Sequence, residues 1–451
     1  MTGVRSGVLG GIVSALVATG GTLAAQQTAP PAPVQPAQLQ VSLEEAVRRA
    51  LDVQPAMVQA RGDQRNAGAG QLSAAGAFLP TITASGSSNL ASANRYNAQT
   101  GQLVNQPSNT AYSGSVGLSF DLFDGFRRFA NKSAASATAD AADAGVVNQR
   151  YQVIATTAQV FFTALANEEL VRVAQAQVER TRAELQTAVN KFQAGAATRS
   201  DTLTATVDVG NALLALLQAQ ANLATAQANL GRQVGVDQLV RAVPDTAFPP
   251  PPDTTTLRAG ALASSPQVQQ AEAKARAAGA QVGVTRSQYW PTLSVSYSNG
   301  YTGLDSLGRF GLSPWTTTQN YVNNWALRFS LSWTLFNGFT REAAYVSAAV
   351  QRDVATATAA DTRRQVNAQL TQQLAAVTTA YAQIGISGAN VAAATEALRV
   401  TQERYRLGAG TLLDLLTAQA NMTQAQVSEV QARYNYLIAR AQVEALVGHA
   451  L

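Results

Sequence analysis

Residues 325–339 read WALRFSLSWTLFNGF. From Trp325 to Leu335 every second residue is apolar, and the residues between are Ala326, Arg328, Ser330, Ser332 and Thr334. This alternation is typical of a strand with one apolar and one small, polar face, and about ten residues suit a strand that crosses an outer membrane. A sandwich strand with one face in water shows the same alternation. The stretch therefore predicts a strand and leaves its surroundings open.

Aromatic residues at both ends of the expected strands favour the membrane. One group consists of Phe123, Phe126, Trp290, Phe336 and Phe339, and a second consists of Tyr112, Tyr301, Trp315, Tyr321 and Trp325. Membrane barrels carry aromatic girdles at their two lipid–water interfaces. We predict that the first group contacts outer-membrane lipid at one interface.

The quoted stretch has a counterpart earlier in the chain. LFDGF at 122–126 matches LFNGF at 335–339, and KFQAG at 191–195 matches RYRLG at 404–408 with the same offset of 213 residues. We therefore predict a duplication. Its boundaries are a first repeat at 42–240, a Pro-rich linker at 241–253 and a second repeat at 254–451.

Within each repeat the hydrophobic period predicts helix, strand, strand, helix, helix. Strands are expected at about 81–90, 112–122, 292–301 and 323–335, and Ser42 with Glu45 forms a capping-box pattern before the first helix. The helix from Phe129 to Phe192 would be about 96 Å long, more than one globular core requires. It should turn at Gly195, and its counterpart at Gly408, through unusual backbone angles. The next helix carries an apolar stripe of Leu203, Val207, Leu214, Leu217, Ala221 and Ala224.

The N-terminus reads as an export signal at 1–25, followed by a Pro/Gln-rich tether at 26–41. A membrane anchor is the alternative, since the uncharged run is just long enough to span. Beyond it we expect no apolar run that would form a transmembrane helix. Any crossing of the membrane would then use strands.

Composition excludes several classes of function. Charged residues are 13% of the chain, there is no Cys, and His449 is the single His. Thiol chemistry and multi-histidine metal sites are excluded, and we expect no catalytic residues, no metal site and no cofactor. The net charge of +5 forms no basic block, so nucleic acid is not expected as a partner.

Four strands cannot close a barrel alone, because the smallest membrane barrels have about eight. An open edge in lipid leaves backbone groups unsatisfied, so copies of the chain must pool their strands. A dimer would give a filled eight-stranded barrel, and a trimer a twelve-stranded barrel with an open lumen. Small polar residues on one face favour the homotrimer. The expected fold is mainly α, with a trimeric membrane barrel and a long periplasmic α-helical barrel.

The duplicated unit resembles the TolC-like outer-membrane efflux proteins over essentially the whole mature chain. The resemblance depends on the two FDGF/FNGF turns and on YRLGAGTLLDLL at 405–416. It implies an outer-membrane exit duct that conducts passively, is gated at its periplasmic helix tips, and docks a periplasmic adaptor and an inner-membrane pump. It implies no enzyme. Drug efflux, metal export and protein secretion share this architecture.

The resemblance also implies roles for residues near the helix tips. Asp201 and Asp414 would line the constriction as acidic rings, although both are also placed to cap helices with Thr198 and Thr411. Gly410 stands where relatives carry a latch Arg, for which Arg199 or Arg406 could substitute. The adaptor-docking surface would consist of Gly195, Ala196, Thr198, Gly408, Ala409 and Thr411.

One alternative is a trimeric coiled-coil stalk or adhesin without transport. It would share the coiled coil and the barrel, but it would not need duplicated strand pairs separated by helices. An enzyme is a second alternative, and no constellation of residues supports it.

Overall fold

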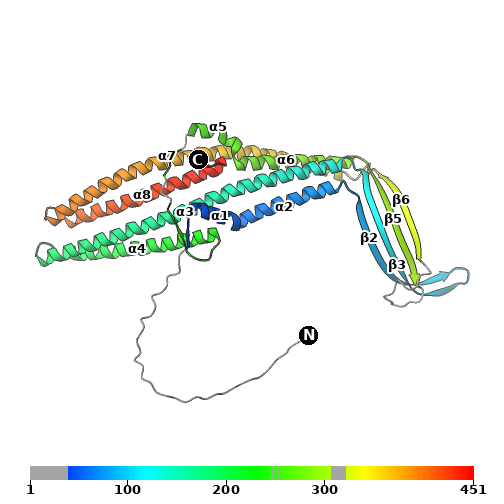
Figure 1. The fold of residues 1–451 in the computed structure, drawn as a ribbon, viewed down its shortest axis with the longest axis horizontal. Helices are drawn as coiled ribbons and strands as arrows, with labels where there is room; N and C mark the ends of the chain where they lie inside the picture. The colour runs from blue at the N-terminus through cyan, green and yellow to red at the C-terminus, as the bar shows by residue number, and fades with distance from the viewer. Residues whose placement is uncertain (1–38, 245–247, 252–253, 306–320) are drawn as a thin grey trace, which may run out of the picture. The chain divides into compact units, whose positions relative to one another are not determined.

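The computed structural model describes residues 39–244, 248–251, 254–305 and 321–451. All of them belong to one compact unit, Leu39–Leu451 (Figure 1). The predicted export signal, residues 26–38 of the predicted tether, and Trp315 lie outside the described residues.

The order of elements repeats along the chain. The first half contains β1 (Leu39–Val41), α1 (Leu43–Val53), α2 (Pro55–Gly76), β2 (Thr81–Asn97), β3 (Gln102–Phe123), α3 (Arg127–Gln193), α4 (Arg199–Val234) and β4 (Val240–Ala242). The second half contains α5 (Thr254–Ser264), α6 (Pro266–Arg286), a 3₁₀ turn (Ser287–Tyr289), β5 (Thr292–Asp305), β6 (Tyr321–Ser332), α7 (Thr340–Arg406) and α8 (Leu412–Val447). Helices α3 and α7 each have 67 residues, and α4 and α8 each have 36. The duplication therefore holds to the residue in these four helices.

Some boundaries differ from those expected from the sequence. Strand β2 continues to Asn97 and β3 already begins at Gln102, so this hairpin is longer than the expected strands at 81–90 and 112–122. Strand β6 ends at Ser332, earlier than the expected end at residue 335. Residues 39–41, expected in the tether, form β1 and pair in parallel with β4. The reason is burial, because Val41 and Val240 belong to the main hydrophobic core.

The first helix is capped only in part as expected. Ser42 Oγ accepts a hydrogen bond from the backbone N–H of Glu45 at 3.3 Å. The Glu45 carboxylate does not return to Ser42 but binds Arg48 and Arg49, which lie on its own helix. Two guanidinium groups one turn away compete better for a carboxylate than one backbone amide does.

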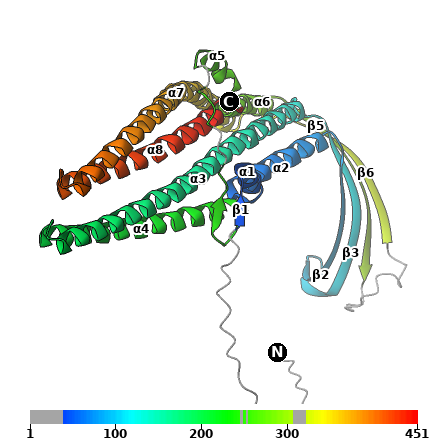
Figure 2. The same cartoon turned by 60° about the vertical axis from the view of Figure 1, so that its left-hand side comes forward.

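The long strands form one antiparallel sheet in the order β2-β3-β5-β6 (Figure 2). One row across all four strands is Ile82, Leu118, Tyr297 and Leu327, and the next row is Thr83, Gly117, Ser298 and Ala326. On the second face, the Ser85 and Ser115 hydroxyls lie 2.8 Å apart, as do those of Ser87 and Ser113. Successive rows face opposite sides of a sheet. The sheet thus has the predicted apolar face and the predicted small, polar face.

The two halves of helix α3 pack against different helices. Its N-terminal half contacts α2 and α6, where the Gln64 amide donates to Asp143 at 2.9 Å and Asn148 donates to Gln270 at 2.9 Å. Its C-terminal half pairs with α4 in one hairpin, and α7 pairs with α8 in a second. The main core lies where the helices meet β1 and β4, and its fully buried side chains include Phe161, Leu230, Leu370, Tyr436 and Val443.

Each strand-to-helix turn has the same strained backbone. Phe126 and Phe339 both have φ of 64°, and the glycines before them, Gly125 and Gly338, have φ of 67° and 68°. Left-handed angles are unfavourable for residues other than Gly. The surroundings of the two glycines differ: a Cβ on Gly125 would lie 2.6 Å from both Ser287 O and Trp290 Cβ, whereas a Cβ on Gly338 would meet nothing within 4 Å.

We expect Gly125→Ala to destabilise the fold far more than its repeat counterpart Gly338→Ala. Gly338→Ala adds only backbone strain, about 1–2 kcal/mol. Gly125→Ala adds the same strain and a clash with backbone and with Trp290, so its total cost should exceed about 3 kcal/mol. Thermal unfolding in detergent measures both variants. Equal midpoints would contradict the close packing of this turn.

One helix in the part of the chain that the structure describes, α4, is long and apolar enough to span a membrane. Little of its apolar stretch is buried within the single chain. The expectation that no such run follows the N-terminal segment was therefore wrong. The reason is the stripe that includes Leu203, Val207, Leu214 and Leu217, each at least 58% exposed. Helical periodicity places this stripe opposite the buried Ala205 and Ala212, which face α3.

Candidate functional site

Each helical hairpin ends in the same tight turn. After α3, Ala196 N–H donates to Lys191 O at 2.8 Å and Gly195 N–H donates to Phe192 O at 3.0 Å. After α7, the equivalent bonds are 2.8 Å and 3.1 Å. Gly195 and Gly408 have φ of 75° and 76°, so the predicted unusual backbone angles are confirmed. This is the Schellman arrangement, in which Gly ends a helix without steric cost.

Both tip carboxylates cap the helix that follows the turn. Thr198 N–H donates to Asp201 Oδ2 at 2.9 Å, and Asp201 N–H donates to Thr198 Oγ1 at 3.2 Å. The Thr411–Asp414 pair makes the same two bonds at 3.1 Å each. The hydroxyl and backbone N–H of Thr411 lower the pKa of Asp414 below its ordinary value. The capping interpretation is confirmed, and it fixes both side chains on the tip surface.

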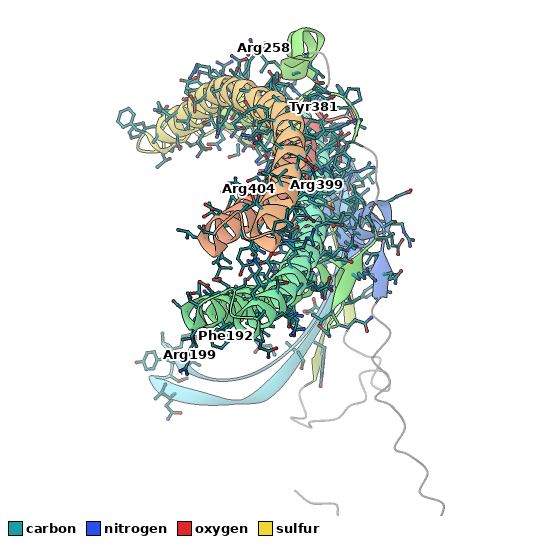
Figure 3. All side chains as sticks on the ribbon, turned by 90° about the vertical axis from the view of Figure 1, so that its left-hand side faces the viewer. Phe192, Arg199, Arg258, Tyr381, Arg399 and Arg404 are labelled. Atoms are coloured by element: carbon teal, nitrogen blue, oxygen red, sulfur yellow. The ribbon has the colours of Figure 1, made fainter. Side chains whose placement is uncertain are left out.

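The basic residues near the tips have different environments. Figure 3 shows Arg199 near the end of the α3–α4 hairpin and Arg404 on the α7–α8 hairpin. Arg406 pairs with Glu403 of its own helix at 2.9 Å. A Cβ on Gly410 would lie 3.3 Å from Arg404 Cβ, so Arg404 occupies the space beside this glycine. Sequence reasoning did not single out Arg404, whose charge also lowers the pKa of Asp414.

One contact joins the two hairpins close to their tips. Lys191 Nζ of α3 donates to the backbone carbonyl of Tyr405 on α7 and lies 3.8 Å from the centroid of the Tyr405 ring. In the sequence, Lys191-Phe192 and Arg404-Tyr405 stand out only as matching positions of the two repeats. A basic residue followed by an aromatic one at the same place in both repeats was the signal that could have found this contact.

The predicted interface aromatics gather at the strand-to-helix turns. Phe123 and Phe126 pack edge to face at 5.4 Å, Phe336 and Phe339 do so at 5.3 Å, and Trp290 lies 6.4 Å from Phe126. All except Phe123 are at least 56% exposed. Exposed aromatic rings at the end of an apolar sheet face are typical of residues at a lipid–water interface.

Among the described residues, no group of three or more His, Cys, Asp or Glu side chains could hold a metal ion. His449 lies at the exposed C-terminal end of the chain.

The family profile of outer membrane efflux proteins matches residues 46–236 and 257–449, which correspond to the two repeats. The chain belongs to the outer membrane efflux protein family. It is located in the outer membrane, with its helical part in the periplasm. The family consists of channel proteins. The predicted resemblance to TolC-like proteins is confirmed, and the comparisons give no support to the stalk alternative.

This outer membrane efflux protein is 26% identical to nodulation protein T of Rhizobium leguminosarum bv. trifolii, over 86% of the chain and 81% of that protein. It is 25% identical to the outer membrane protein TolC of Escherichia coli, over 68% of the chain and 64% of TolC. The outer membrane protein VceC of Vibrio cholerae has the same fold, with a TM-score of 0.74 and 19% identity over 90% of the chain and 96% of VceC.

Proposed function

We propose that three copies of this chain form a closed duct that passively conducts substrates from the periplasm to the outside. The duct would consist of a twelve-stranded barrel in the outer membrane and a helical tube below it. We infer that the protein performs no chemical conversion, and that the energy for export comes from an inner-membrane pump.

The unpaired edges of the four-stranded sheet are the main support for this proposal. Its order is β2-β3-β5-β6, so within the described residues the outer edges of β2 and β6 have no strand beside them. Unpaired backbone edges are not tolerated in lipid, which requires each edge to find a partner. The strands alternate in direction, so β6 of one copy and β2 of the next can continue the antiparallel order. A head-to-tail contact of this kind closes into a ring.

The faces of the sheet favour three copies over two. The polar face carries small residues such as Thr83, Gly117, Ser298 and Ala326. An eight-stranded barrel needs side chains that fill its interior, whereas a wider barrel leaves a water-filled lumen. Small hydroxyl-bearing side chains suit the lining of a lumen. The apolar face, with Leu118, Leu327 and Leu331 exposed, suits lipid.

The exposed stripe of α4 supports contact between neighbouring copies in the helical tube. Leu214 and Leu217 are 66% and 61% exposed in the single chain. Contiguous apolar surface of this kind marks an interaction site. A neighbouring copy at this face would bury the stripe and remove the one feature of α4 that resembles a membrane span.

We assign the gate to the hairpin tips. Three copies of Asp201 and three of Asp414 would form acidic rings that favour cations at the inner mouth. The Lys191–Tyr405 contact would hold the two hairpins of one chain together when the duct is closed. Besides Lys191, the basic residues Arg199, Arg404 and Arg406 lie close to these tips. Arg404 lies beside Gly410, where the expected latch residue is absent.

The adaptor would dock on the same tips. Gly195, Ala196, Thr198, Gly408, Ala409 and Thr411 are all exposed. Their side chains are small, so the backbone of a partner helix or loop can approach them closely. The positioning of the two turns by identical hydrogen bonds gives the partner two equivalent binding surfaces in each copy.

Ion conductance of the purified protein in planar lipid bilayers tests the proposal. We expect discrete, cation-preferring channel events without any added energy source. A stalk or adhesin would be silent in the same bilayers, and that result would contradict the proposal.

A further inference from the structure

A cluster of buried polar side chains lies between the two helical hairpins, a few turns from their tips. Glu184 of α3 is 8% exposed, and neither of its carboxylate oxygens makes a hydrogen bond of normal geometry. Asp208 of α4 and Tyr405 of α7 also bury an oxygen without a partner. A buried carboxyl without a partner is costly when it is ionised.

Neither Arg180 nor helix α8 provides an ion-pair partner for the Glu184 carboxyl. Arg180, one turn earlier on α3, directs its guanidinium to α8, where it lies 3.4 Å from Thr423 Oγ1 and 3.5 Å from Gln426 Oε1. Its Nε is buried without a partner. Helices α3 and α8 run antiparallel, so the turn of α8 that lies nearer the tip than Thr423 corresponds to the level of Glu184. This turn carries Gln419, which is uncharged and 6% exposed.

Among the described residues, the charged and titratable groups that act on Glu184 are Arg180 on its own helix and Asp208 on α4. Tyr405 on α7 is coupled to Glu184, and Asp201 of α4 and Lys191 of α3 act on Tyr405 in turn. Helix α8 adds only uncharged groups at this level. Burial raises the pKa of Glu184 to about 7, since it outweighs the opposite effects of the Gln402 amide and of Arg180, while Asp208 adds to the rise.

We propose that Glu184 is a proton-controlled latch between the two hairpins, which favours their packed arrangement when neutral and their separation when ionised. The proposal depends on the proposed function for its consequence, since separated hairpins would widen the inner mouth. Groups of α4 and α7 act on the buried side chain, and α8 packs against the same helix at Arg180. Separation of the hairpins is therefore the movement that brings Glu184 into water.

The direction of the pH effect follows from the two states. In the packed state the pKa is raised to about 7, whereas a hydrated carboxyl keeps its ordinary value of 4.5. Below 4.5 both states hold the proton and the packed state is most favoured. Between these values the separated state loses its proton first, and the preference for packing falls by up to about tenfold per pH unit. Above 7 both are ionised and the preference is constant.

The distance between hairpin tips tests the latch without relying on conduction. The chain has no Cys, so Gln193→Cys and Leu407→Cys place single spin labels on the ends of α3 and α7 in the full assembly. In this background we expect the separated fraction to rise several-fold from about pH 5 to about pH 7.5 and then to level off. The Glu184→Gln variant keeps the shape of the side chain but cannot ionise, and it should stay packed across the range.

Asp208→Asn is the matched control. It leaves Glu184 in place and removes the neighbouring carboxylate that raises its pKa, so the pH response should persist with a lower midpoint. A response that survives in Glu184→Gln, or is absent from the parent protein, would overturn the latch. A tip distance that follows pH while bilayer conductance does not would support the latch and contradict the assignment of the gate to the hairpin tips. Silent bilayers at every pH would instead contradict the proposed conducting role.

Discussion

Replacing Leu214 and Leu217 together by aspartate will prevent the chains from forming their trimer. Both side chains are more than 60% exposed in the single chain and belong to the uncharged stripe of α4. If a neighbouring copy covers them, each replacement loses about 1.5–3 kcal/mol of apolar burial and also places an unpaired charge in the interface. This loss of binding free energy occurs at each interface between neighbouring copies in the ring. Size-exclusion chromatography with light scattering should show single chains or aggregates in detergent.

The control for this experiment lies on the same helix. Asn222→Asp with Asn229→Asp adds the same two charges at exposed positions roughly a quarter-turn away from the stripe. This variant should assemble like the parent protein. If the Leu214/Leu217 double variant still assembles fully, the stripe does not lie between copies, and the helical tube must be built in another way.

The second large effect concerns Asp414, for which capping and pore lining make different predictions. Asp414→Asn keeps an oxygen that can accept the Thr411 N–H bond but removes the charge. We expect this variant to unfold at nearly the same temperature as the parent, while its preference for cations over anions falls several-fold. Asp414→Ala removes the cap as well, so it should also lower the unfolding temperature. Reversal potentials in a salt gradient and thermal unfolding separate the two roles.

The pH dependence of this selectivity has a defined sign. Thr411 lowers the pKa of Asp414 below its ordinary value of 3.8, so the carboxylate is mostly ionised above that pH. Its contribution to cation preference should therefore persist on acidification and disappear only below that value. An Asp414→Asn variant with unchanged selectivity would leave the carboxylate with its capping role alone.

The sequence predicts those features that depend on local pattern. Alternation from Trp325 to Ser332 is a property of neighbouring residues, and the strand β6 follows it. Gly195 and Gly408 could be assigned because a helix that must turn sharply needs a left-handed residue, and their φ values agree. The duplication also helped, because an element that is clear in one repeat predicts the same element 213 residues away in the other.

Features that depend on distant partners were not predictable in the same way. The three residues of β1 carry too little pattern to reveal their pairing with β4, some 200 residues later. The contact of Lys191 with Tyr405 depends on the register between two hairpins, which no local spacing specifies. Glu184 looks in the sequence like an ordinary helical carboxylate, and only the packing of four helices shows that it is buried.

The most direct test of the account is the number of chains in the assembly that inserts into lipid. Native mass spectrometry of the protein, released intact from detergent, gives this number without reference to its activity. We expect a mass of three processed chains, because the sheet of the described residues has four strands and leaves the outer edges of β2 and β6 without a neighbouring strand. A stable, folded species with the mass of one chain would contradict it.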